Sequence, residues 1–148
     1  MTWVHYALLS ALFAGLTALL AKIGVTDVPS NLATLIRTIV VVGFASAIVL
    51  FTGEVKAVRS LAARDWLSLV ASGLATGGSW LFYFAALKHG PLSGVAPIDK
   101  SSFLIAMALG FLVLREPVRP LTLLGAALVA AGVALTIPSV QEAARRLF

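Results

Sequence analysis

The chain has 148 residues, of which 60% are hydrophobic and 11% are charged, with a formal net charge of +5 and no cysteine. Soluble domains average about 45–50% apolar and about 25% charged residues, so this composition excludes an ordinary soluble domain and indicates an integral membrane protein. The Lys and Arg residues are scattered over the expected helix ends, which favours charges that flank membrane helices over a nucleic-acid-binding surface.

Five apolar segments reach or approach the length of about 20 residues that a membrane span requires. The first segment lacks the cationic start of a signal peptide and is too long for one, so we expect it to be retained as a span. The five segments are Trp3–Ile23, Asn31–Thr52, Trp66–Leu87, Leu92–Leu114 and Leu121–Ile137, and the last is the shortest. The sequence therefore predicts an all-α integral membrane domain over residues 1–138, followed by a short polar tail over residues 139–148. We expect this tail to continue for about two helical turns at the water boundary, with Arg145 and Arg146 solvated.

The connections between the spans alternate between the two sides of the membrane. Residues 53–65 and 115–120 would share the side of the N-terminus, called side A, whereas residues 88–91 and the tail would lie on side B. The flanking cations are Lys56, Arg59, Arg64, Arg115 and Arg119 on side A, and Lys22, Lys88, Arg145 and Arg146 on side B. Because the two sides are almost balanced, the positive-inside rule predicts insertion in both orientations, with a slight preference for side A in the cytoplasm.

Several polar residues inside the spans lie at one depth. A rise of 1.5 Å per residue places both Arg37 and Asp99 about 9–11 Å below the surface of side B. The layer at this depth comprises Thr17, Arg37, Thr38, Trp80, Tyr83, Asp99, Lys100, Ser101 and Ser102. A charge near the bilayer centre costs at least about 2.5–3.5 kcal/mol, so such residues need a partner or a function.

We predict that Asp99 lies near Arg37 at the edge of a central cavity. The candidate substrate contacts are Lys100, Ser102, Trp80 and Tyr83, and together with Arg37 and Asp99 they make up the predicted site. If movement of the helices separates the charged pair, Asp99 can take up a proton and couple an ion gradient to alternating access.

Each of these assignments has an alternative. The Arg37–Asp99 pair can be a static ion pair that sets helix register. Lys100 lies about 100° around the helix from Asp99, so its long stem can line the cavity or extend toward side B. Trp80 and Tyr83 share a helix face and can form an aromatic wall for a substrate, including a cationic one, or can anchor the helix at the membrane interface.

The sequence contains no recognisable catalytic constellation. His5 and His89 are expected at opposite sides of the membrane, so they cannot share a metal ion, and no histidine lies at the depth of Ser101 and Ser102 to activate either hydroxyl. A glycine-rich phosphate loop is also absent from the sequence. We therefore expect no enzymatic activity, no metal and no cofactor.

Three stretches resemble the EamA-like group of the drug/metabolite transporter superfamily. They are SNLATLIRTIVV (residues 30–41), SWLFYFAALKHGPLSGVAPIDKSS (79–102) and LVLREPVRPLTLLGAALVAAGVAL (112–135). The VAP motif (95–97) near the start of the fourth span and Glu116 match the repeat of this group, and IDK (98–100) is typical of its small single-repeat members. Larger members carry two repeats and ten helices, so the resemblance implies one five-helix repeat.

The resemblance implies a secondary transporter that exports small metabolites or drugs across a bacterial or archaeal inner membrane. Two copies in opposite orientations would supply the inverted repeat of the larger relatives, so the expected partners are a second copy of the chain, a small-molecule substrate and membrane lipid, without nucleic acid. The alternative is a membrane scaffold that transports nothing. The polar layer favours transport, because a scaffold has little use for two charges at one depth.

Overall fold

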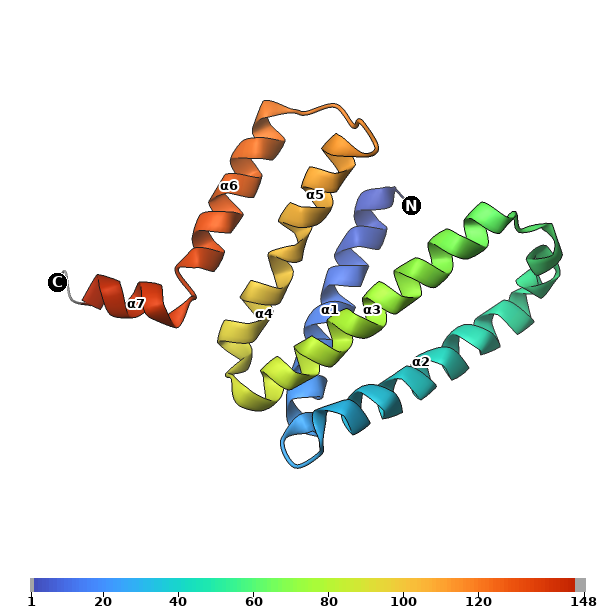
Figure 1. Cartoon of the computed structure of the whole chain (residues 1–148), viewed down its shortest axis with the longest axis horizontal. Helices are drawn as coiled ribbons and strands as arrows, with labels where there is room; N and C mark the ends of the chain where they lie inside the picture. Colours follow the sequence, from blue (N-terminus) through green and yellow to red (C-terminus); the bar gives the residue numbers. More distant parts are fainter. Residues whose placement is uncertain (1, 146–148) are drawn as a thin grey trace. The chain divides into compact units, whose positions relative to one another are not determined.

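The computed structural model describes residues 2–145, with side chains described as far as Glu142. Over these residues the chain forms α-helices and one 3-10 helix, without strands (Figure 1). Contacts divide the chain after His89 into two units, and each is considered by itself. The side chains of Arg145 and Arg146, which were expected to be solvated, lie outside the described part.

The first unit consists of three long helices. They are α1 (Trp3–Val25), α2 (Ser30–Thr52) and α3 (Ala63–His89), and the 3-10 helix η1 (Glu54–Ser60) joins the last two. Each long helix contacts the other two, and Figure 1 shows α3 crossing α1. All three are long and apolar enough to cross a membrane, as expected from the sequence.

The connection between α2 and α3 is more ordered than the expected loop. Gly53 has a φ of 73°, a left-handed conformation that glycine adopts readily, and it ends α2. The helix α3 begins at Ala63, three residues before the predicted start, because the Asp65 carboxylate accepts a hydrogen bond of 3.0 Å from the Ala62 N–H. The predicted loop is thus mostly helical.

The second unit contains α4 (Leu92–Lys100), α5 (Ser102–Leu112), α6 (Pro120–Ala134) and α7 (Pro138–Arg145). Within this unit α4 contacts both α5 and α6. The helices α4 and α5 replace the single helix predicted for the fourth span, although together Leu92–Leu112 is long and apolar enough to cross a membrane. The tail is helical as α7, in agreement with the expected two turns.

The fifth predicted span is the exception in length. The helix α6 has 15 residues, or about 22 Å at 1.5 Å per residue, whereas a hydrocarbon core is about 30 Å thick. Before it, Arg115 takes a φ of 55°, and the Glu116 N–H donates to the Gly110 carbonyl oxygen at 3.2 Å. A Cβ at Gly110 would lie 3.0 Å from the Glu116 carboxylate, so this turn favours glycine there. A fifth crossing stays a prediction.

The best-packed part of the first unit lies at one end, where α1 and α3 finish and α2 begins; we call it the B end. The apolar residues buried there are Ala18, Ala21, Val25, Phe84 and Leu87, and Thr34 in the first turns of α2 is buried as well. Most large apolar side chains elsewhere on these three helices are exposed, as expected for surfaces that face lipid or another protein chain.

Candidate functional site

A cavity of about 360 Å³ lies among the three helices of the first unit. Its lining residues are Thr17, Leu20, Ala21, Gly24, Val28, Ala33, Ile36, Arg37 and Phe84. Small-molecule sites commonly measure about 300–1,000 Å³ and combine apolar walls with a few polar groups. Here the lining supplies one hydroxyl, from Thr17, and one charge, from Arg37, so the cavity has the size and composition of a ligand site.

The Arg37 guanidinium is held against aromatic rings. Its central carbon lies 4.2 Å from the centroid of the Trp80 ring and 5.7 Å from that of Phe84. Trp80 and Phe84 are four residues apart on α3, so both rings face α2 from the same side of the helix. A cation within about 6 Å of an aromatic face is attracted by the quadrupole of the ring. Trp80 and Phe84 therefore position Arg37 at the cavity wall.

Arg37 has no carboxylate partner among the described residues of the first unit. The acidic residues there are Asp27, Glu54 and Asp65, and all lie in turns or at helix ends rather than inside the spans. Among the described residues, an ion pair joins Asp99 to Lys100, in the second unit. Within its own unit, Arg37 thus presents an uncompensated positive charge to an apolar cavity.

The threonines of α2 bond to their own helix. The Thr34 hydroxyl donates to the Ser30 carbonyl oxygen at 2.9 Å, and the Thr38 hydroxyl donates to that of Thr34 at 2.8 Å. Thr38 belongs to the predicted polar layer but does not line the cavity, whereas Thr17 does. The two hydroxyls satisfy backbone groups, so Thr17 is the better candidate for a polar ligand contact.

Two lysines connect the helices at the B end. The Lys22 ammonium donates to the Leu87 carbonyl oxygen at 2.6 Å, and the Lys88 ammonium donates to the Val28 carbonyl oxygen at 2.8 Å. The sequence indicated only that both lysines flank a span. Leu87 lies near the end of α3, where backbone carbonyls lack helical partners and attract cations. The preference of lysine for helix C-termini was therefore a signal in the sequence for a bond of this kind. These bonds join α1, α3 and the α1–α2 turn beside the cavity.

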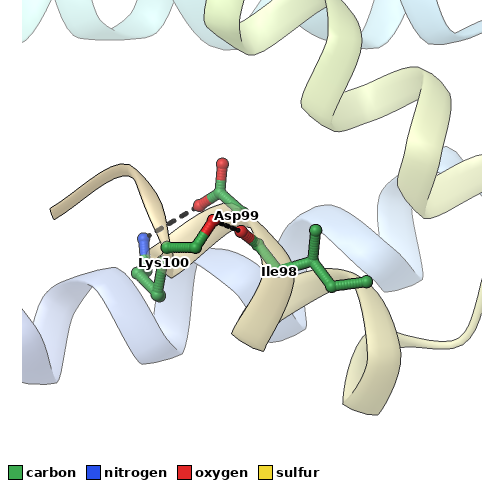
Figure 2. A network of polar contacts seen from close by, with 4 residues as sticks. Ile98, Asp99 and Lys100 are labelled. Atoms are coloured by element: carbon green, nitrogen blue, oxygen red, sulfur yellow. Dashed lines mark hydrogen bonds and ion pairs between the residues drawn. The ribbon is translucent and has the colours of Figure 1, made fainter. Parts of the chain in front are cut away.

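The charged residues of the second unit lie at the break between α4 and α5, which Figure 2 shows. The Lys100 ammonium lies 3.2 Å from the Asp99 carboxylate, and the Ser101 hydroxyl donates to the Ile98 carbonyl oxygen at 2.7 Å. The Lys100 side chain is 61% exposed and that of Asp99 is 28% exposed. Asp99 is therefore the more protected of the two charges.

Adjacent residues project about 100° apart around a helix, so the side chains of Asp99 and Lys100 were expected to point in different directions rather than to pair. The flexible stem of Lys100 lets its ammonium turn back to the preceding residue. The break itself follows Pro97, which lacks an N–H and weakens the last turns of α4. That proline inside the predicted span was the sequence signal for a discontinuous helix.

The predicted site residues thus fall into two groups. In the first unit, Arg37 and Trp80 come together, and the Tyr83 ring meets the edge of Phe84 with centroids 6.4 Å apart. In the second unit, Asp99 and Lys100 pair beside Ser102, the exposed first residue of α5. The predicted Arg37–Asp99 pair joins residues of both units and stays a prediction.

Phe84 was not among the predicted residues, although its position one helical turn after Trp80 could have indicated it.

As for metals, no cluster of three or more His, Asp or Glu residues is found in the part of the chain that the structure describes. The site offers a cation, aromatic faces and apolar walls, which suit the binding and orientation of a small molecule.

Comparison with known proteins assigns this architecture to a family. The model of the EamA-like transporter family matches residues 1–137. A Sinorhizobium protein named "Uncharacterized transporter in cobO 3'region" is 48% identical over 134 residues, which are 90% of this chain and 95% of that protein. No solved structure matches the chain. Because the family match covers most of its length, this multi-pass membrane transporter belongs to the EamA-like transporter family.

Proposed function

We propose that the chain is a secondary transporter that exports small metabolites or drugs across a bacterial or archaeal inner membrane as a homodimer. The family match over residues 1–137 carries the transport assignment, and the relative from Sinorhizobium bears a transporter name over nearly its whole length. Export, rather than uptake, is the direction implied by the family resemblance. The protein is a carrier and not an enzyme.

The cavity of the first unit is the proposed substrate site. It has the volume of a small-molecule pocket, and its single charge is oriented by Trp80 and Phe84 before any ligand arrives. A preoriented group loses little conformational freedom on binding, which favours affinity. Tyr83 supports this arrangement through its contact with Phe84.

A second copy of the chain is the proposed partner. Gly73 and Gly77 form a GxxxG spacing on α3, and a Cβ added to either would meet no heavy atom within 4 Å in the described part of the chain. Such small-residue faces let membrane helices approach closely. The near balance of flanking cations supports an antiparallel arrangement, in which two copies supply an inverted repeat.

Asp99 is the proposed coupling residue. It lies just before Ser101, where α4 meets α5 through a residue that keeps right-handed helical dihedrals, and ionisable residues inside membrane spans commonly mark ion and substrate pathways. We propose that Asp99 is the counter-charge of Arg37 in one state of the transport cycle. When this pair opens, the carboxylate takes up a proton, while Lys100 remains within ion-pair distance as a local cation. Ser102 is retained as a proposed substrate contact.

Counterflow in proteoliposomes tests the transport function. Ligands that raise the unfolding temperature of the detergent-solubilised protein would first be selected, and each would then be followed in labelled form. We expect counterflow by the wild type and by Arg64→Gln, a control that removes the same charge from the first turns of α3, and strongly reduced counterflow by Arg37→Gln. Stabilising ligands that never cross faster than in protein-free liposomes would contradict the proposal.

A further inference from the structure

The charge of the cavity restricts the ligands that it can hold. Arg37 is its one charged lining residue, and the carboxylates of the first unit lie outside the spans. In an apolar environment the field of a charge is weakly screened, so a cationic ligand is repelled and an anionic one is attracted. The cavity therefore selects first by the sign of the charge.

The aromatic residues reinforce this selection. A wall formed by Trp80 could have received a cationic substrate, but the Arg37 guanidinium already lies over that ring at 4.2 Å. The second ring, Phe84, also has Arg37 at 5.7 Å and is buried. The rings thus hold the protein's own cation, and the guanidinium edge remains for an anion.

The remaining walls determine the rest of the ligand. Leu20, Ile36 and Phe84 offer hydrocarbon surface, and Thr17 adds one hydroxyl. The volume of 360 Å³ lies at the lower end of the range of about 300–1,000 Å³ that small-molecule pockets commonly show, so the cavity suits a compact ligand. A polyanion would leave charges against apolar walls, which is costly.

We propose that the cavity binds an organic monoanion, with one carboxylate or similar group on Arg37 and an apolar body against Leu20, Ile36 and Phe84. The planar guanidinium can donate two parallel hydrogen bonds to such a group. The inference rests on the proposed function, because it names the substrate class of the site proposed for transport.

Trp80 provides a direct reporter of binding. The chain has three tryptophans, so Trp3→Phe with Trp66→Phe leaves Trp80, beside Arg37, as the single tryptophan. Phenylacetate, phenylacetamide and phenethylamine have similar size and shape but are anionic, neutral and cationic, respectively. The full chain in phosphatidylcholine nanodiscs would be titrated with each, and the Trp80 emission recorded.

We expect a saturable change with phenylacetate and at least about tenfold weaker responses to the other two probes, because a hydrogen bond to a charged group commonly contributes a tenfold to hundredfold factor. Arg37→Gln should remove the preference and Arg37→Lys should retain part of it, since lysine keeps the charge but not the planar fork. Arg64→Gln, the control outside the cavity, should retain it fully.

No saturable response to phenylacetate, equal responses to all three probes, or a preference for phenethylamine would overturn the inference. A response to added phosphatidylglycerol that phenylacetate cannot reproduce would do so too, because the anion site would then belong to lipid. If Arg37→Gln does not fold, the relative affinities of the three probes for the single-tryptophan protein that keeps Arg37 still test the inference. Binding without counterflow would contradict the proposed transport function alone, whereas counterflow restricted to neutral or cationic ligands would contradict this inference alone.

Discussion

Replacing Trp80 by leucine should release Arg37 from its position at the cavity wall. Leucine retains apolar bulk but has no aromatic face, so the substitution removes mainly the interaction measured at 4.2 Å. Cation–π pairs contribute about 0.5–1 kcal/mol when exposed and about 2 kcal/mol or more when desolvated. Arg37 and Trp80 are both half-buried, so we expect a coupling energy of about 1–2 kcal/mol.

The coupling energy is measured with a double-mutant cycle of Trp80→Leu and Arg37→Gln, from the free energies of unfolding in mixed detergent micelles. The same cycle with Phe84→Leu should give a smaller value, below about 1 kcal/mol, because 5.7 Å is close to the 6 Å limit of the interaction. Trp66→Leu near the other end of α3 is the matched control and should show no coupling beyond about 0.5 kcal/mol.

The order of these three coupling energies is the critical result. A coupling for Trp80 no larger than that for Trp66 would show that the aromatic face does not hold Arg37. A larger coupling for Phe84 than for Trp80 would show that the geometry of the two rings has been assigned wrongly. Either result would refute the reasoning that makes Arg37 a preoriented anion-binding group.

The other predictions concern the B end, the topology and the orientation. Lys22→Met should lower the free energy of unfolding by about 1–2 kcal/mol, and Lys88→Met by less, because the Lys22 bond is part-buried and the Lys88 bond is exposed; equal losses would contradict this order. Single cysteines at positions 58 and 117 should react with impermeant reagents from the same side, and labelling from opposite sides in one molecule would refute the five-span topology. Lysines added to the loops of one side should trap one orientation and depress transport, which co-expression of the oppositely biased variant should restore; full transport by a single fixed orientation would exclude the antiparallel dimer.

Depth along a helix could be predicted from the sequence, because the rise per residue is constant. That regularity brought Arg37 and Trp80 into one predicted layer, and the structure places them in contact. The direction in which each side chain points depends on how α2 and α3 rotate against each other. For that reason Phe84, an ordinary apolar residue in the sequence, was missed. Thr38, which its depth placed in the polar layer, bonds to its own helix and does not line the cavity.

Hydropathy also does not predict where the backbone departs from a regular helix. The fourth predicted span is apolar enough throughout, yet its helix breaks at Ser101, four residues after Pro97. Lys22 and Lys88 were interpreted only as charges that flank the spans, and their bonds to backbone carbonyls were not predicted. A sequence does not show which carbonyl a flexible ammonium group will reach. The length of α6 was overestimated because apolar residues continue through the turn that follows it.

The central claim is that Arg37 and Asp99 belong to the machinery of a transporter. Flux driven by a pH gradient in proteoliposomes tests it most directly, with the best stabilising ligand as substrate and the Arg37→Gln, Asp99→Asn double variant beside the wild type. The double variant removes both charges of the proposed pair, and Lys100, which loses its neighbour Asp99, is 61% exposed to solvent. A merely structural Arg37–Asp99 pair therefore predicts normal folding and normal flux. We predict that the wild type moves the ligand against its gradient and that the folded double variant does not. Uphill flux by the double variant at the wild-type rate, or no flux by the wild type above protein-free liposomes, would contradict the claim.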